Sequence, residues 1–293
     1  MPLKKEKKVA LITGATSGIG FATAVGLLQQ GYHVVLHGRN LHSVSSAQVR
    51  LKAEAGQEFE NSIDTVYADL ADSKAINEMV DQLSSTYNRL DLLINNAGII
   101  YKDRLTNAEG FEMQFAVNHL APFRLTKLLS PLLLENAKSK RDTRVINVSS
   151  NAHFRGQIDF EDLNSEKNYQ GFKVYSFTKL ANVLFSNALA RQFADTGIRS
   201  HAIHPGVVDT GIGSKHTGIY KYAWKLITLF GLSAKNGAST SLHAATNKEA
   251  GSASGLYFVK SKAISPSKIA FDLNTQDQLW RKSLSLTGME DGR

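Results

Sequence analysis

The strongest constraint on the fold is a short apolar run near the N-terminus that ends in a glycine-rich turn. Residues 9–13 form this run, which predicts a buried strand, and an apolar helical pattern follows the turn at 13–20. Gly14 permits a tight turn, while Gly18 and Gly20 let the backbone approach an anion and let the helix pack on the strand. The N-terminus of that helix offers free N–H groups. The segment therefore predicts a loop that binds the pyrophosphate of a dinucleotide.

The rest of the chain alternates strand-like apolar runs with helical patterns, without a linker or a repeat of fixed period. This alternation predicts a single α/β domain over residues 1–293, a doubly wound (Rossmann) sheet of about seven parallel strands with helices on both faces. The further strands are expected at 32–36, 63–68, 90–94, 144–148, 198–203 and 256–259, and the further helices at 41–55, 72–87, 109–137, 174–193, 234–246 and 275–284.

Two segments interrupt this alternation. Residues 151–173 form a polar insertion, and residues 211–232 mix glycine with aromatic and aliphatic side chains. The second segment follows a strand and is expected over the strand ends, where it would serve as a substrate lid. A helix facing the core is an equally good interpretation, because glycines flank helices in both cases.

The composition excludes several classes of function. The chain contains no cysteine, which excludes disulfides, thiol catalysis and cysteine-ligated metals and fits a cytoplasmic location. Its net charge of +8 comes from scattered basic residues without a nucleic-acid-binding motif, so we expect no nucleic-acid partner. No apolar run reaches the roughly 18 residues that span a membrane, and the run after the basic N-terminus is too short for a signal peptide. We predict no metal site.

The end of the second strand bears on the choice of cofactor. A site for NAD usually carries an acidic residue here to bind the ribose 2′-hydroxyl, whereas this chain has His37-Gly38-Arg39-Asn40. Arg39 stands where the 2′-phosphate of NADP would lie, so we predict NADP(H) and consider NAD(H) the lesser alternative. The competing interpretation is that Arg39 is a surface residue in a turn and has no role in cofactor binding. The fourth strand ends in Asn95-Asn96-Ala97-Gly98, whose small and amide side chains suit a backbone packed against a flat ring, or an ordinary turn.

Tyr175 and Lys179 lie four residues apart at the start of the helix predicted at 174–193, so their side chains project from the same face. An ammonium group beside a phenol favours the phenolate and lowers the pKa of the tyrosine, which makes a proton donor for neutral pH. An amphipathic helix with an incidental tyrosine and lysine is the competing interpretation. Tyr169 and Lys173 have the same spacing, but Gly171 lies between them and predicts a loop or the approach to the helix.

Asn118 falls in the middle of the helix predicted at 109–137. Pro122 follows shortly after it and predicts a bend. Because a bend frees backbone groups, we expect irregular geometry at Asn118.

Taken in order, these motifs resemble the short-chain dehydrogenase/reductase family of the compact single-domain type, over Lys8 to Val259. The residues that carry the resemblance are Thr13-Gly14, Gly18-Ile19-Gly20, Asp69, Asn95-Asn96-Ala97-Gly98, Asn118, Ser150, Tyr175 with Lys179, and Pro205-Gly206 with Thr210. The sequence around Ser150 and Tyr175 looks most like that of the retinol-dehydrogenase-like branch. Members of that branch tend to carry an insertion like the one at residues 151–173.

The resemblance implies hydride transfer between a nicotinamide and a small-molecule carbonyl or alcohol. It implies that Tyr175 transfers the proton, that Lys179 lowers the pKa of Tyr175 and holds the nicotinamide ribose, and that Ser150 bonds the substrate oxygen. The family pattern favours Ser150 over Ser149, and Asn118 would hold a water that links Lys179 to solvent.

The resemblance also implies a set of cofactor contacts. Asp69 would lie at the adenine edge, Asn96 and Gly98 on the adenosine side, and Thr210 near the nicotinamide carboxamide or the pyrophosphate. The complete set expected at the cofactor is Gly14, Thr16, Ser17, Gly18, Ile19, Gly20, Arg39, Asp69, Leu70, Asn96, Ala97, Gly98, Tyr175, Lys179, Pro205, Gly206, Val208 and Thr210.

The leading hypothesis is thus an NADP(H)-dependent carbonyl reductase or alcohol dehydrogenase. A non-catalytic NADP-binding regulator on the same fold is the first alternative, which the complete set Asn118, Ser150, Tyr175 and Lys179 disfavours. A sugar-nucleotide epimerase or dehydratase of the extended branch is disfavoured by the glycine spacing of residues 14–20. Family members often pair through the two helices predicted at 109–137 and 174–193, so a homo-oligomer is the assembly that the resemblance suggests.

Overall fold

The computed structural model describes residues 7–139, 142–206 and 234–291. In this part of the chain, one sheet has the strand order β3-β2-β1-β4-β5-β6-β7-β8. The strands are β1 Val9–Ile12, β2 His33–Gly38, β3 Ile63–Tyr67, β4 Leu92–Asn95, β5 Thr143–Val148, β6 Ile198–His204, β7 Leu256–Val259 and β8 Lys262–Ile264. Strands β1 to β7 run parallel to one another.

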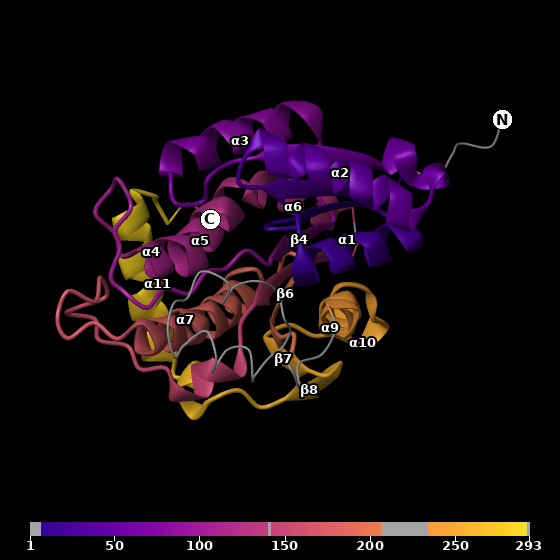
Figure 1. Ribbon diagram of the computed structural model, residues 1–293. Helices are drawn as coiled ribbons and strands as arrows, with labels where there is room; N and C mark the ends of the chain where they lie inside the picture. Colours follow the sequence, from indigo (N-terminus) through magenta and orange to yellow (C-terminus); the bar gives the residue numbers. More distant parts are fainter. Residues whose placement is uncertain (1–6, 140–141, 207–233, 292–293) are drawn as a thin grey trace.

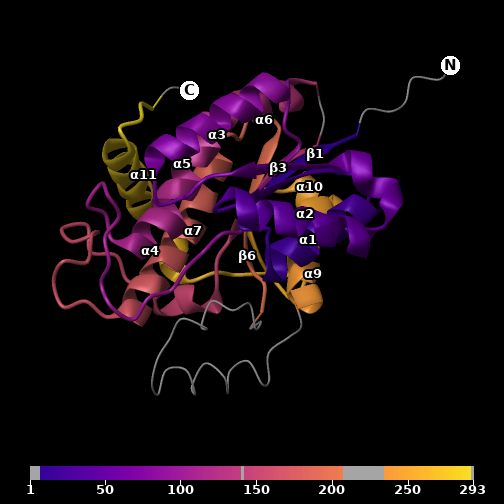
Figure 2. The ribbon, with the colours of Figure 1, turned by 45° about the horizontal axis from the view of Figure 1, so that its top comes forward.

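Helices cover both faces of the sheet, as the sequence predicts. Figures 1 and 2 show α3, α5, α7 and α11 on the left of the molecule and α1, α2, α9 and α10 on the right. The helices are α1 Gly18–Gln29, α2 Leu41–Ala55, α3 Ser73–Thr86, α4 Met113–Phe115, α5 Ala121–Leu128, α6 Ser130–Lys138, α7 Gly171–Gln192, α9 Ala234–Thr246, α10 Lys248–Ser252 and α11 Leu273–Thr287. Short helical turns lie at η1 Gln57–Ser62, η2 Ala116–Leu120, η3 Asn151–Arg155 and η4 Lys268–Phe271.

Alternating side chains of the strands build two separate cores. Leu11 of β1 and Val145 of β5 point to the face that α3, α5, α6, α7 and α11 cover. Ile12 and Ile146, their neighbours in sequence, point to the face under α1, α2, α9 and α10. Strands buried on both faces read as continuous apolar runs, which is why they were recognisable in the sequence. The predicted doubly wound α/β fold is confirmed.

The edge of the sheet differs from the prediction. β8 is an eighth strand and pairs with β7 in the antiparallel direction. Lys260 and Ser261 turn the chain between them with φ of 48° and 60°, a left-handed conformation unusual for residues other than glycine. No glycine or asparagine marks this turn in the sequence, so the hairpin gave no recognisable signal.

The helix predicted at 109–137 is broken into several pieces. It begins at Met113 with α4, passes through η2, a π-helical turn, and continues as α5 and α6. Pro122 lies in the first turn of α5 and Ser130-Pro131 begins α6, so each proline stands where its missing N–H is tolerated. Asn118 lies inside the π-helical turn. The expected irregular geometry at Asn118 is confirmed, whereas the single long helix is wrong.

The helix that carries Tyr175 starts earlier than predicted. α7 begins at Gly171, which is buried, and a Cβ at this position would lie 2.9 Å from the carbonyl oxygen of Lys102. Gly171 is therefore a point of close packing and a helix start. Of the two alternatives predicted for this stretch, the approach to the helix is confirmed and the loop is wrong at Gly171. The predicted insertion at 151–173 accordingly contains η3, an irregular stretch and the first turn of α7. The predicted lid at 211–232 lies outside the described residues.

Candidate active site

A large cleft opens at the edge of the sheet where the parallel strands end. Its volume is about 820 Å³. The chain reverses its direction of winding between β1 and β4, and ligands of open α/β sheets bind at such a switch point. The cleft is lined by Gly14, Thr16, Ser17, Ile19, Gly20, His37, Gly38, Arg39, Ala68, Asp69, Leu70, Ala71, Asn96, Ala97, Gly98, Ile99, Tyr101, Met113, Val117, Val148, Ser149, Ser150, Asn151, Ala152, Arg155, Phe172, Tyr175, Lys179, His204, Pro205 and Gly206.

The glycine loop is fixed to the end of β4 by a compact set of hydrogen bonds. The Thr13 hydroxyl accepts from the backbone N–H groups of Asn96 and Ala97, at 2.9 and 3.0 Å. The Asn96 amide donates to the Thr13 carbonyl at 2.8 Å. Gly14 has φ of 62°, and a Cβ on it would lie 2.9 Å from Ala97 Cα, while one on Gly20 would lie 2.6 Å from the Gly14 carbonyl oxygen. Only glycine fits these two positions, so the loop forms a backbone surface open to a phosphate.

The N-terminus of α1 is free to bind an anion. Ser17, its N-cap residue, makes no capping hydrogen bond, and the first turn carries no acidic residue. By contrast, Asn40, Asp72 and Asp272 cap the N-termini of α2, α3 and α11 with their side chains. The first N–H groups of a helix need partners, and a pyrophosphate supplies them. This uncapped terminus and the glycine surface beside it fit a dinucleotide.

His37 holds the glycine loop by a hydrogen bond to its backbone, a role that the sequence analysis missed. Its Nδ1 accepts from the N–H of Gly14 at 3.2 Å, and its Nε2 lies 3.2 Å from the carbonyl oxygen of Ala68. Since a carbonyl only accepts, the ring proton is on Nε2. Burial lowers the pKa of His37 to about 4, which keeps the ring neutral. A polar side chain at the end of a buried strand was the available signal.

Arg39 and Asp69, both expected at the cofactor, bind each other. Arg39 Nε donates to Asp69 Oδ2 at 2.9 Å, and Asp69 Oδ1 accepts from the N–H of Ala71 at 3.0 Å. The side chain of Arg39 is 68% exposed. The pair lies at one end of the cleft, where β2 and β3 end, with most of the guanidinium still accessible.

Tyr175 and Ser150 meet at the other end of the cleft. The Ser150 hydroxyl lies close enough to the phenol oxygen to hydrogen-bond it, which lowers the pKa of Tyr175, but burial has the larger effect and raises this pKa to about 12. The sequence analysis predicted that Lys179 would lower the pKa of Tyr175. This prediction is wrong, because burial of the phenol dominates and raises its pKa. Ser149 is turned away and donates to the Lys179 carbonyl at 2.7 Å. Of the two serines, Ser150 is the one beside the phenol.

Lys179, Asn118 and Gly98 share one small space behind Tyr175. Lys179 Nζ donates to the carbonyl of Val148 at 3.1 Å and lies 5.5 Å from the centre of the Tyr175 ring. Burial lowers the pKa of Lys179 to about 8. The Asn118 side chain bonds the backbone of Ile99 in both directions, at 2.8 and 2.9 Å. A Cβ on Gly98 would lie 3.2 Å from Lys179 Nζ and 3.5 Å from Asn118 Oδ1, so the glycine leaves that space open.

Most of the expected site residues lie in one cleft. Gly18 and Asn118 are described but do not line it, while Val208 and Thr210 lie outside the described residues. Besides His37, the sequence analysis missed Ile99, Tyr101, Met113, Val117, Arg155, Phe172 and His204 as lining residues. These are apolar, aromatic or single polar residues without a motif, and only the fold brings them together.

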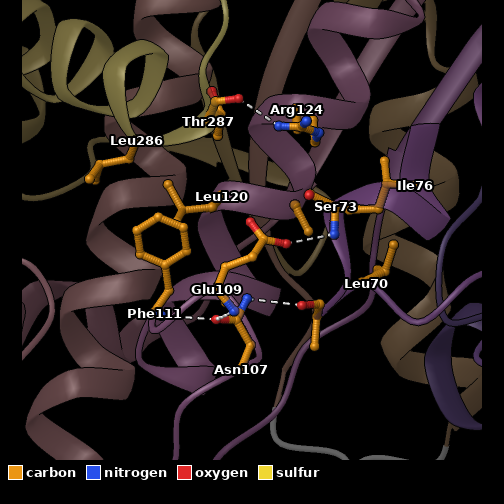
Figure 3. A pocket seen from close by; sticks show the side chains of 13 residues that line it. Leu70, Ser73, Ile76, Asn107, Glu109, Phe111, Leu120, Arg124, Leu286 and Thr287 are labelled. Carbon is orange, nitrogen blue, oxygen red and sulfur yellow. Dashed lines mark hydrogen bonds between the residues drawn. The ribbon is translucent and has the colours of Figure 1, made fainter.

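A second cavity is much smaller and contains none of the expected catalytic residues (Figure 3). Its volume is about 30 Å³, and it lies among the N-terminus of α3, the 107–111 turn, η2 and the end of α11. Polar contacts close it: Glu109 accepts from the N–H of Ser73 at 2.9 Å, and Arg124 donates to the Thr287 carbonyl at 2.6 Å. Its size suits at most a solvent molecule.

Two kinds of feature are not found in the described part of the chain. No helix in the described ranges is long and apolar enough to cross a bilayer. Within the same ranges, no cluster of three or more histidine, aspartate or glutamate side chains has the arrangement of a metal site.

Comparison with known proteins assigns the chain to a family. The family described as short chain dehydrogenase matches residues 8–218. The chain belongs to the short-chain dehydrogenase family. The predicted family is confirmed, and the protein is an oxidoreductase that uses a nicotinamide cofactor on alcohol or carbonyl groups.

Similar proteins place this dehydrogenase in the retinol-dehydrogenase-like branch, also as predicted. Retinol dehydrogenase 13 of Homo sapiens is 37% identical over 290 residues, covering 97% of this chain and 85% of that protein. Retinol dehydrogenase 12 of Homo sapiens is 38% identical over 284 residues, covering 96% of this chain and 87% of that protein.

Solved structures share the dehydrogenase fold. An uncharacterized protein from Mycobacterium Paratuberculosis is 30% identical with a TM-score of 0.76, covering 98% of this chain and 95% of that one. A 3-ketoacyl-(acyl-carrier-protein) reductase from Brucella melitensis complexed with NADH is 25% identical, with a TM-score of 0.66 over 86% of this chain and 96% of that one. Pseudomonas aeruginosa RhlG, in a complex with NADP, is 24% identical with a TM-score of 0.68 over 86% and 93%, and shows the fold alone.

Proposed function

We propose that the protein is an NADP(H)-dependent carbonyl reductase or alcohol dehydrogenase in which Tyr175 is the general acid and base. The observation that supports this most is the position of the Tyr175 phenol in the cleft beside Ser150, with a pKa raised to about 12. A phenol with this pKa is protonated at neutral pH and so can donate to a carbonyl oxygen. General acid–base catalysis of this kind contributes roughly 10²–10⁴-fold to the rate.

The nicotinamide, when bound, supplies or accepts the hydride. The residues of the chain do the remaining work. Ser150 holds the substrate oxygen by a hydrogen bond, and Tyr175 gives this oxygen a proton in reduction or removes one in oxidation. The positive charge of Lys179 stabilises the phenolate that donation leaves behind. Lys179 also holds the nicotinamide ribose.

The space around Gly98 supports a path for the proton that replaces the one donated. Lys179 Nζ and Asn118 Oδ1 both border the position that a Cβ of residue 98 would occupy. Because Gly98 has no side chain, a water in the space beside it would reach both groups. We therefore propose that Asn118 relays protons between Lys179 and solvent.

Arg39 supports NADP(H) as the preferred cofactor. It follows β2 directly and lines the cleft, and its guanidinium is mostly exposed. A 2′-phosphate can bond two guanidinium N–H groups at once, which a hydroxyl cannot. The acidic residue of this region, Asp69, already binds Arg39 and the N–H of Ala71, so it is a poor partner for a ribose hydroxyl.

Turnover of a panel of aldehydes and ketones, including retinal because of the named relatives, tests this function. We expect oxidation of NADPH at a kcat/KM well above that with NADH. Arg39→Ala should raise the KM for NADPH about tenfold, since a charge-assisted hydrogen bond contributes about 1.5–3 kcal/mol and less when exposed, and should leave the KM for NADH unchanged. Equal losses with both cofactors would contradict the NADP assignment. Tight NADPH binding without turnover of any compound would favour the non-catalytic regulator.

A further inference from the structure

A buried histidine lies directly behind Ser150. His153 belongs to η3, the turn that begins right after Ser150, and it is 0% exposed. Its Nδ1 lies 2.8 Å from the carbonyl oxygen of Ser150. On the far side of the ring, Nε2 accepts from the backbone N–H of Ser267 at 3.1 Å. One imidazole thus joins the proposed catalytic serine to a segment more than a hundred residues away.

These two partners fix the tautomer of His153. The N–H of Ser267 can only donate, so Nε2 must carry a lone pair, and a carbonyl can only accept, so Nδ1 must carry the proton. Burial lowers the pKa of His153, which favours this neutral form. Both ring nitrogens are therefore used, each in a role that the other tautomer could not fill.

The ring has little freedom to move. Its centre lies 4.7 Å from that of Tyr257 at an interplanar angle of 63°, and 4.0 Å from that of Phe154. The Tyr257 hydroxyl bonds the Asn151 side chain in the same turn at 3.4 Å. Gly156 closes the turn, where a Cβ would lie 2.7 Å from Leu180 Cβ on α7. The turn after Ser150 is held between α7 and β7, with His153 at its centre.

We propose that His153 is a positioning residue for Ser150. Its Nδ1–H holds the Ser150 carbonyl, and the N–H of Ser267 holds the ring in the tautomer that can do so. Together they set the backbone from which the Ser150 hydroxyl reaches the phenol of Tyr175. This inference rests on the role proposed above for Ser150. The C-terminal segment around Ser267 thereby becomes part of the support of the catalytic site, although it lines no part of the cleft.

Two substitutions of His153 each retain one of its two hydrogen bonds, the one to the Ser150 carbonyl or the one from the N–H of Ser267. Asparagine can place an amide N–H near the position of Nδ1, and glutamine can place an amide oxygen near that of Nε2. We expect His153→Gln to lower kcat about 10- to 100-fold, because a misplacement of about 1 Å costs up to about 10²-fold, with an unchanged Kd for NADPH. His153→Asn should keep kcat within about threefold of the wild type, because it retains the donor to Ser150.

A histidine elsewhere in the sheet provides the matched control. His201 is also 0% exposed, its Nε2 lies 2.8 Å from the Ala250 carbonyl, and its Nδ1 accepts from the N–H of Leu256 at 3.3 Å. It does not line the cleft. His201→Gln should lower the melting temperature as much as His153→Gln does, and leave kcat unchanged. A parallel loss of kcat in both variants would show that stability, and not positioning, governs the effect.

Ser267→Pro tests the far end without touching the histidine. Ser267 has φ of −56°, which suits proline. The substitution removes the backbone N–H that fixes the tautomer, together with a hydroxyl that makes no hydrogen bond to the described residues. Nitrogen-15 shifts of the imidazole should show the Nδ1–H tautomer in the wild type and a mixture in Ser267→Pro, with a several-fold loss of kcat. A pure Nδ1–H tautomer in both, or the opposite tautomer in the wild type, would overturn the proposal.

A double-mutant cycle with Ser150→Ala closes the test. If His153 acts through Ser150, then His153→Gln should cause no further loss of kcat once the hydroxyl is gone. The same fold-loss in both backgrounds would overturn the proposal while leaving the role of Ser150 intact. Full activity of Ser150→Ala itself would instead refute the proposed function at that residue, so the two failures are distinguishable.

Discussion

Two tyrosines in this chain, Tyr169 and Tyr175, each precede a lysine by four residues, and the fold gives them different surroundings. Tyr175 lies on α7 and lines the large cleft together with Lys179. Tyr169 lies just before α7, outside the cleft, and Lys173 is exposed. The shared spacing therefore carries no function by itself. What distinguishes the pairs is where α7 begins and which side of it faces the strand ends.

The partners of the two phenols differ in the same way. Tyr169 donates to the buried carboxylate of Glu112 at 3.0 Å and accepts from Gln114 at 2.9 Å, so both of its hydrogen-bonding roles are filled by structural groups. Tyr175 has Ser150 as its neighbour and an opening to the cleft. Burial raises the pKa of both phenols, so the pKa does not separate them either. What distinguishes the two phenols is that only Tyr175 lines the cleft, where a substrate could reach it.

The largest expected difference between the pairs is in turnover. Tyr175→Phe should lower kcat by about 10²–10⁴-fold, because it removes the general acid, while the Kd for NADPH stays near that of the wild type. Tyr169→Phe should keep kcat within about twofold. Steady-state kinetics and fluorescence titration with NADPH measure both quantities. Comparable losses in the two variants would end the distinction drawn here.

The lysines should differ almost as much. Lys179→Met removes the charge beside the phenol and should lower kcat about 10²-fold or more, an electrostatic effect of the size seen for single catalytic groups. Stability should change little, because a costly buried charge is removed and the Val148 carbonyl keeps a second donor, the Asn182 amide at 3.4 Å. Lys173→Met, at an exposed position, should leave both kcat and the melting temperature unchanged. An inactive Lys173→Met would point to a role for the outer pair.

The pH dependence should follow Lys179. Its pKa of about 8 in the folded protein lies below the usual value of 10.5, so the ammonium loses its proton as the pH rises through about 8 while the phenol, at about 12, stays protonated. The kcat for carbonyl reduction should therefore fall above about pH 8. Rate measurements in the wild type and in Lys179→Met would check this, since the variant should lack that limb. A flat wild-type profile up to pH 10 would contradict it.

The smallest effect is on stability, and here the order of the tyrosines reverses. Tyr169→Phe leaves the buried Glu112 without one of its donors, which should lower the free energy of unfolding by about 1–2 kcal/mol. Tyr175→Phe loses only a partly exposed bond and should change it by less than about 0.5 kcal/mol. Urea denaturation followed by circular dichroism would show this. Equal stability of the two variants would mean that Tyr169 does not anchor the insertion.

The part of the site formed by backbone groups could be predicted, because neighbouring residues in the sequence determine it. The tight turn at Gly14, the helix N-terminus after the glycine loop and the small residues after β4 all follow from short sequence windows. The side-chain half depends on distant contacts. His37, on β2, reaches the glycine loop that follows the neighbouring strand β1, 23 residues away in sequence, and His153 reaches Ser267 across 114 residues. The pKa of Tyr175 depends on its burial, which spacing alone does not reveal.

The bend at Asn118 combines a feature that local sequence predicts with one that depends on distant contacts. Pro122 announced an irregularity, but its form, a π-helical turn whose asparagine pairs with the backbone of Ile99, depends on a segment after β4 that the helix pattern does not contain. The same holds for Gly171, where a local breaker signal left a loop and the approach to the helix as alternatives. The close contact of Gly171 with the backbone of residues 101 and 102, which accompanies the helix start, is not visible in that local pattern.

The most direct test of the account is the transfer of label from NADPH that carries deuterium at C4 of the nicotinamide to a carbonyl substrate. We predict an alcohol with deuterium on its carbinol carbon from the wild type and from Tyr169→Phe, and no product from Tyr175→Phe although this variant binds the cofactor. An alcohol without deuterium, or equal product from Tyr175→Phe and Tyr169→Phe, would contradict the assignment of this cleft and of Tyr175.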